Sequence, residues 1–82
     1  MTKKQMKEEL MWKVNYNREQ AIEWFRKCNV KDIEEGTSKY TLYREYAARA
    51  YENIDVLECL GFITKAEIDE LYKKTIEEIT RA

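Results

Sequence analysis

One segment decides the fold, and it reads Gly61-Phe62-Ile63-Thr64-Lys65-Ala66-Glu67-Ile68. Glycine is the residue that most often ends a helix in the left-handed conformation, so the preceding helix ends near residue 60. Thr64 and Glu67 have the spacing of a capping box, and Ile63 and Ile68 have the spacing of a hydrophobic staple. The segment therefore predicts a new helix from residue 65. Because so few residues join the two helices, we expect them to pack antiparallel.

The helices on either side of this segment show apolar stripes at helical spacing. The preceding helix is predicted over 38–60, capped by Thr37 or Ser38. Its stripe consists of Tyr40, Tyr43, Tyr46, Ala47, Ala50, Tyr51, Ile54 and Leu57. The following helix is predicted over 65–81. Its stripe consists of Ile68, Leu71, Tyr72, Ile76 and Ile79.

A further helix is predicted over 3–28, because Thr2 and Gln5 form another capping box. Asn29 is expected to end it in the left-handed conformation. Its stripe consists of Met6, Leu10, Val14, Ala21, Trp24, Phe25 and Cys28. A second interpretation stays open, because residues 17–20 also resemble a capping box. In that case the helix breaks near 15–17.

Together these patterns predict an all-α fold, an antiparallel three-helix bundle that forms one domain over residues 1–82. The chain has no proline, and no stretch alternates apolar and polar residues for the length of a strand. Residues 30–36 are expected to connect the first two helices, with Val30 and Ile33 tucked under the end of the bundle.

The composition excludes most catalytic chemistry. There is no histidine, so Ser-His and Cys-His catalysis and imidazole metal ligands are absent. Two glycines cannot build a phosphate-binding loop. Cys28 lies at the end of the first predicted helix, near the start of the second, and Cys59 lies at the far end of the second. The two are therefore too far apart for a disulfide. We expect a protein that is not an enzyme and that has no cofactor and no metal site.

The chain shows no apolar segment that resembles a secretory signal or a membrane span. The expected location is the cytoplasm, with no membrane partner. The formal net charge is −1, but it is unevenly distributed: residues 1–31 carry +4 and residues 32–82 carry −5. The simplest interpretation is that the first helix packs on the other two. An acidic half that faces a basic site on another protein is the alternative.

Trp12 and Tyr16 are the main candidate for a binding site. They lie four residues apart, so their rings share one helix face, opposite the apolar stripe if the helix is continuous. Exposed Trp and Tyr are typical of binding hot spots. We expect a protein-binding surface of Trp12, Tyr16, Glu19 and Glu23. The alternative is that a break near 15–17 turns both rings into the core.

Two further features have competing interpretations. Asn17 lies within the apolar stripe, where it could cap a helix, fix the register of a coiled-coil dimer or lie partly exposed. The tyrosines over 40–46 alternate with basic residues, as in single-strand nucleic-acid binding, but they also fall on the core stripe. Core packing is the better interpretation, and nucleic acid is not the expected partner.

The function predicted from these features is a small non-enzymatic protein-binding module. The compact Lys-, Glu- and Tyr-rich chain resembles small phage and mobile-element proteins that modulate host protein complexes, including anti-CRISPR-type inhibitors. The resemblance is one of composition over the whole chain and includes no motif. Two alternatives are a helix-turn-helix transcriptional regulator, which a pI near 5.6 disfavours, and a self-assembling structural subunit. A homodimer is also expected, because so short a chain buries only about 60% of its surface.

Overall fold

The computed structural model describes all of residues 1–82 and contains helices and loops without strands. The helices are α1 (Lys3–Lys27), α2 (Val30–Glu35), α3 (Ser38–Cys59) and α4 (Lys65–Arg81). The predicted all-α class is confirmed, and the bounds of the three long helices agree with the prediction to within one residue. The short helix α2 was not predicted. None of the four helices combines the length and the apolar character needed to cross a membrane.

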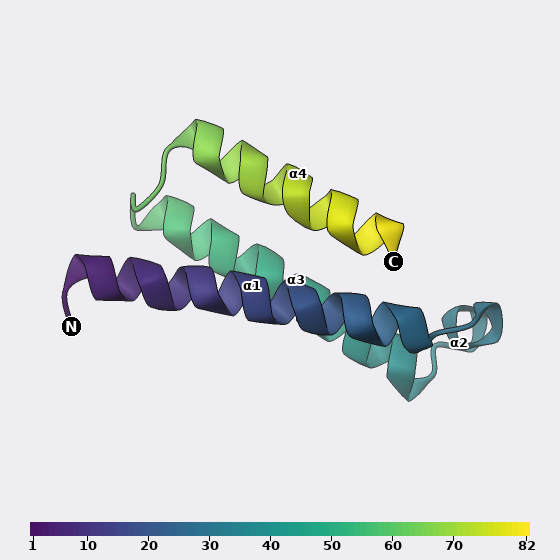
Figure 1. The fold of residues 1–82 in the computed structure, drawn as a ribbon. Coiled ribbons are helices and arrows are strands. Elements are labelled where there is room, and N and C mark those ends of the chain that lie inside the picture. The colour runs from purple at the N-terminus through teal and green to yellow at the C-terminus, as the bar shows by residue number, and fades with distance from the viewer.

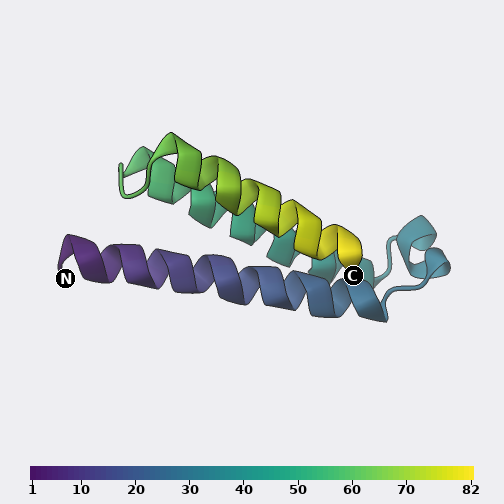
Figure 2. The same ribbon diagram turned by 45° about the horizontal axis from the view of Figure 1, so that its top comes forward.

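The three long helices run alternately up and down an elongated molecule (Figure 1). Helices α1 and α3 lie antiparallel and share the most extensive packing. Helix α4 runs back along α3, so it points in the same direction as α1. The molecule measures 44 × 25 × 16 Å. The C-terminal end of α4 lies close to α1, whereas the N-terminal end of α4 lies farther from α1 (Figure 2). A hollow in the surface lies where these two helices diverge.

Helix α1 is continuous, so the alternative of a break near 15–17 is wrong. Its capping box is present: the Thr2 hydroxyl accepts from the Gln5 backbone N–H at 3.1 Å, and the Gln5 side chain accepts from the Thr2 N–H at 2.8 Å. The second asparagine-led motif over 17–20 does not cap anything, because the backbone groups there are already paired within the helix.

The predicted connector over 30–36 is wrong in detail, because Asn29 starts a helix instead of ending one. Its φ of −101° is not left-handed, and it forms a capping box with Asp32 through two bonds of 2.9 Å. The turn of helix α2 that follows leaves Val30 71% and Ile33 41% exposed. These two side chains therefore do not tuck under the bundle.

The turn between α3 and α4 has the geometry that its sequence predicts. Gly61 has a φ of +68°, and its N–H donates to the Glu58 carbonyl at 2.9 Å. The Phe62 N–H donates to the Leu57 carbonyl at 3.0 Å, which completes a Schellman motif. Thr64 then caps α4 with Glu67, through bonds of 3.1 and 3.2 Å. The chain thus reverses within a few residues.

The core consists of two small clusters between the long helices. The first contains Val14, Ile54, Leu57 and Ile68, and the second contains Ala21, Ala47 and Ile79. On α4 the predicted stripe is partly wrong: Thr75 is fully buried, whereas Ile76 is 49% exposed. Helix α4 is therefore turned so that a hydroxyl-bearing residue, not the neighbouring isoleucine, meets the other helices.

Candidate protein-binding surface

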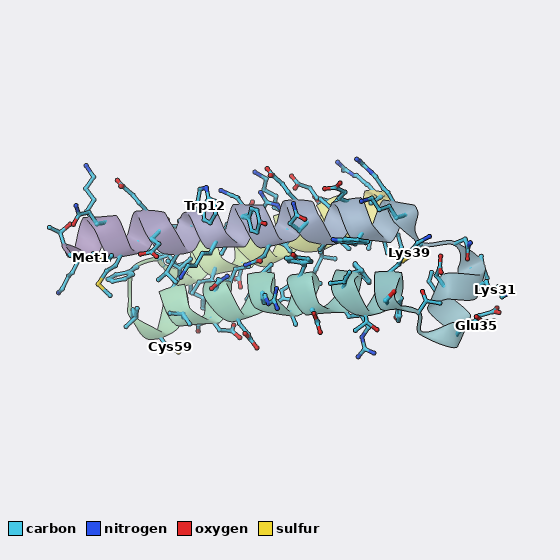
Figure 3. The ribbon with its side chains drawn as sticks, turned by 90° about the horizontal axis from the view of Figure 1, so that it is seen from below. Met1, Trp12, Lys31, Glu35, Lys39 and Cys59 are labelled. Atoms are coloured by element: carbon cyan, nitrogen blue, oxygen red, sulfur yellow. The ribbon has the colours of Figure 1, made fainter.

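Trp12 and Tyr16 form an exposed aromatic pair on α1. Their rings stack with centroids 5.1 Å apart and planes 10° from parallel, as their i, i+4 spacing allows. The indole is 61% exposed and the phenol ring 41% exposed. Neither ring is in the core, so the alternative in which both turn inward is wrong. Trp12 lies in the N-terminal half of α1, far from α2 at the other end of the molecule (Figure 3).

The aromatic pair is anchored to α3. The ring of Tyr46 meets the ring of Tyr16 edge-on, with centroids 6.5 Å apart and planes at 77°. The Arg49 guanidinium also contacts Tyr46, 5.2 Å from the centre of its ring. Sequence reasoning placed Tyr46 on the core stripe and missed this contact. The chain of Trp12, Tyr16, Tyr46 and Arg49 gives the exposed indole a fixed support.

The two predicted acidic members of the surface also lie exposed on α1. Glu23 forms an ion pair with Lys27 at 3.4 Å, and the Lys27 ammonium lies 4.4 Å from the centre of the Trp24 ring. Glu19 forms no ion pair, so its carboxylate is free to meet a cation on another molecule. All four predicted residues therefore lie on one side of α1. Trp12 and Tyr16 form the end of this surface that is nearer the N-terminus.

A buried guanidinium lies next to this surface, and no local pattern in the sequence predicts it. Arg18 on α1 is 5% exposed, and its Nε lies 2.9 Å from a carboxylate oxygen of Glu78 on α4. Its Nη2 donates to the Asn15 side chain at 2.7 Å. The Nε–Glu78 contact is an ion pair without hydrogen-bond alignment, and Nη1 has no partner. Asn17 is buried beside it, within an unbroken helix, so it caps nothing.

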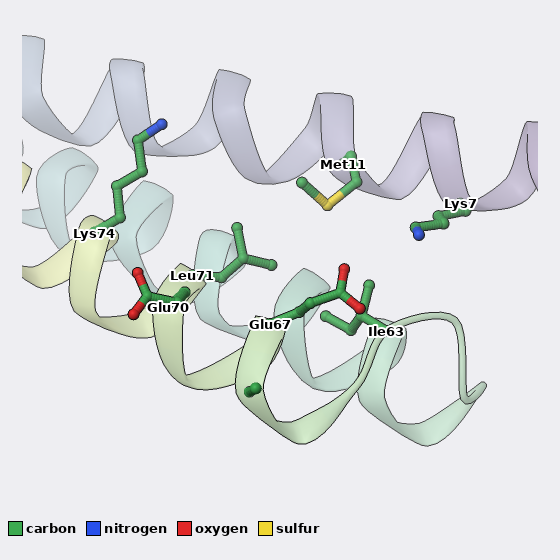
Figure 4. Close-up of a pocket in the computed structure, with 8 residues that line it drawn as sticks. Lys7, Met11, Ile63, Glu67, Glu70, Leu71 and Lys74 are labelled. Atoms are coloured by element: carbon green, nitrogen blue, oxygen red, sulfur yellow. The ribbon is translucent and has the colours of Figure 1, made fainter.

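Two hollows lie along the N-terminal half of α1. The larger, of about 580 Å³, lies between the diverging ends of α1 and α4 (Figure 4). It is lined by Lys7, Met11, Ile63, Ala66, Glu67, Glu70, Leu71 and Lys74. The second lies along α1 beside Trp12 and is lined by Lys4, Lys7, Glu8, Met11, Trp12 and Asn15. Lys7 and Met11 line both hollows, and Trp12 lines only the second.

The tyrosines over 40–46 are engaged within the chain. Phe25 packs on Tyr43 with centroids 4.9 Å apart, and Tyr40 lies 5.8 Å from Tyr43. The Arg44 guanidinium lies over the Tyr40 ring at 5.9 Å. These rings therefore support the hairpin of α1 and α3 in the way that the core interpretation predicts.

The chemically reactive groups are few and scattered. Cys28 and Cys59 are both free thiols, as predicted, and burial followed by the nearby Asp32 carboxylate raises the pKa of Cys28. Cys28 is half-buried, less enclosed than its expected place in the core. No group of three or more Cys, Asp or Glu side chains lies close enough to hold a metal ion. The arrangement of side chains on α1 is suited to binding, through exposed rings next to a surface hollow.

Comparison of the chain with protein-family models, with curated proteins and with solved structures gives no match.

Proposed function

We propose that this protein is a non-enzymatic binding module that docks on another protein through the face of α1 that carries Trp12, Tyr16, Glu19 and Glu23. The observation that carries the proposal is that the indole of Trp12 is 61% exposed although it is held by a ring stack. Exposed tryptophan is costly to leave in water and is the residue most enriched at binding hot spots.

The support beneath Trp12 favours binding for an entropic reason. A ring that is already fixed by Tyr16 and Tyr46 loses little conformational freedom when a partner covers it. Covering about 100 Å² of exposed indole contributes about 2.5 kcal/mol at 25 cal/mol per Å². One such residue is enough to act as the centre of a small interface, with Glu19 and Glu23 at its rim.

The biological setting is part of the same proposal. The three long helices serve as one antiparallel bundle whose role is to present α1, and the protein works in the cytoplasm. Its composition, which resembles that of small phage and mobile-element proteins, favours a host protein complex as the target and modulation or inhibition of that complex as the consequence.

Affinity capture with matched variants tests this proposal. The chain is immobilised and exposed to an extract of the cells in which its gene is expressed, and bound proteins are identified by mass spectrometry. The test variant combines Trp12→Ala with Tyr16→Ala. The control combines Val30→Ala with Ile33→Ala on α2, where the apolar side chains are exposed to a similar degree. A partner captured by the native chain and the control, and lost by the test variant, is the expected result. Equal capture by both variants contradicts the proposal.

A further inference from the structure

Helix α4 is packed less extensively than the other two long helices. Helices α1 and α3 share far more contact with each other than either shares with α4. Of the 17 residues of α4, only Ile68, Thr75 and Ile79 are buried. The apolar packing that holds α4 in place therefore depends mainly on two isoleucines, one near each end of the helix. At its N-terminal end, α4 also lies away from α1, across the hollow that Met11 and Leu71 line (Figure 2).

The packing of α4 buries polar groups that have no partner. The hydroxyl of Thr75 on α4 is fully buried and forms no hydrogen bond. Nη1 of Arg18, whose guanidinium is paired with Glu78 of α4, is also buried and unpartnered. A buried polar group without a hydrogen bond is less stable than the same group in water. Docking of α4 therefore carries a penalty that its release removes, and the attraction between Arg18 and Glu78 is offset by the cost of burying the guanidinium.

Helix α4 is joined to α3 by an aromatic contact and a hydrogen bond. The ring centroids of Tyr51 and Tyr72 lie 5.7 Å apart, with planes 17° from parallel. The Tyr72 hydroxyl donates to the Asp55 carboxylate at an exposed position. Because water can take the place of either partner there, new hydrogen bonds to water partly compensate the loss of this bond when α4 leaves.

The hairpin of α1 and α3 has aromatic contacts of its own. Phe25 on α1 packs on Tyr43 on α3, with ring centroids 4.9 Å apart. Tyr16 meets Tyr46 edge-on, with centroids 6.5 Å apart. Neither contact includes a residue of α4, so both can persist after α4 has left. The two helices are also longer than α4, with 25 and 22 residues. The hairpin therefore has a source of stability that does not involve α4.

We propose that α4 is a releasable helix, which leaves the hairpin of α1 and α3 as one unit while the hairpin stays folded. The movement takes place at the turn at Gly61, which joins α3 to α4. Release uncovers the first core cluster, because Ile68 is its only member on α4. Its other members, Val14, Ile54 and Leu57, are fully buried when α4 is docked and form a second apolar surface on the hairpin when it is released. This opening does not depend on the docking function proposed above.

Hydrogen exchange of the complete ¹⁵N-labelled chain, measured by NMR at urea concentrations below the unfolding transition, tests the release of α4. Amides that exchange through the opening of one unit share one opening free energy and one dependence on urea. We expect the inner amides of α4 to share such an opening. Their protection factors should be lower than those of the best-protected amides of α1 and α3 by about tenfold or more, with a weaker dependence on urea. A single opening shared by all three helices overturns the proposal, and so does exchange in α4 that is graded along the helix and independent of urea.

Two conservative variants separate the release of α4 from the unfolding of the whole chain. Phe25→Leu weakens a contact that survives release, so it should lower the protection of α1 and α3 by about fivefold and leave that of α4 unchanged. Thr75→Val removes the unpartnered hydroxyl with little change in volume, so it should raise the protection of α4 by about fivefold. If Phe25→Leu lowers protection by the same factor in all three helices, the chain opens as one unit and the proposal is overturned. Protection of α4 that does not rise in Thr75→Val overturns it as well.

Discussion

The guanidinium of Arg18 on α1 and the carboxylate of Glu78 on α4 form an ion pair between the two helices, with Nε 2.9 Å from Oε2. Arg18 is almost completely buried, whereas Glu78 keeps about a third of its side chain exposed. This pair lies where α4 approaches α1, and the hollow lined by Met11 and Leu71 lies where the two helices diverge (Figure 2).

Removing the Glu78 carboxylate should lower the free energy of unfolding more than removing the Arg18 guanidinium. In Glu78→Gln the guanidinium stays buried without its anion, and we expect a loss of about 1–3 kcal/mol in the free energy of unfolding. In Arg18→Met the buried charge and its unpartnered Nη1 are both gone, so stability should change less or increase. Urea denaturation of both variants measures the difference. An Arg18→Met variant less stable than Glu78→Gln would contradict this account of the pair.

Trp12 should contribute little to the stability of a single copy. Because the indole is mostly exposed, Trp12→Ala should change the free energy of unfolding by no more than about 0.5 kcal/mol at a concentration where the chain is monomeric. Ile54→Ala is the comparison, because Ile54 is fully buried and its truncation should cost about 2–5 kcal/mol. Similar losses in thermal or urea unfolding would show that Trp12 belongs to the core.

Position 61 should require glycine because of its left-handed backbone, and not because a side chain would lack space. A Cβ at this position would meet nothing within 4 Å, but the φ of +68° is unfavourable for alanine. Gly61→Ala should therefore cost about 1–2 kcal/mol, and Gly61→Asn should cost less. Calorimetric melting of the two variants tests this order. Equal melting temperatures for alanine and the native glycine would mean that the turn changes conformation freely.

Tyr72 on α4 should be the last tyrosine to ionise. Its hydroxyl donates to the Asp55 carboxylate on α3, and this bond, with burial and the acidic neighbours, raises the pKa of Tyr72 to about 12. Because the folded pKa is raised, the contact stabilises the protein below the usual tyrosine pKa and is lost as the pH rises through about 12. Absorbance titration of tyrosinate should show one late step that Asp55→Asn moves to lower pH. A last step that stays at the same pH in Asp55→Asn would contradict its assignment to the bond between Tyr72 and Asp55.

Local signals predicted most of the fold. The capping boxes of Thr2 and Thr64 and the left-handed Gly61 involve residues within four positions of each other, so the sequence displays them directly. Helix α2 was not predicted because asparagine is common at both ends of helices. Asn29 is interpreted from the sequence as a C-terminal cap, although Asp32, three residues later, completes an N-terminal capping box. Six residues are also too few for an apolar period to show.

Features that depend on the orientation of a helix could not be predicted in the same way. Thr75 and Ile76 are neighbours, and only the final rotation of α4 decides that the threonine is buried. The pairing of Arg18 with Glu78 joins residues that are far apart in the chain, and a charged side chain is ordinarily expected in water. The exposure of Trp12 and Tyr16, by contrast, follows from the period of one continuous helix. The hollow between α1 and α4 follows from the divergence of α4, which no local pattern displays.

The most direct measurement of the central claim is the response of the two indole N–H signals in a ¹⁵N-labelled chain. Assigned with Trp24→Phe, they report separately on Trp12 and Trp24 while the captured protein is added, unlabelled, to a dilute sample. The claim that α1 docks through its aromatic pair predicts that the Trp12 signal shifts or broadens in proportion to binding while the Trp24 signal stays in place. A Trp12 signal that remains sharp and unmoved in the complex would contradict it.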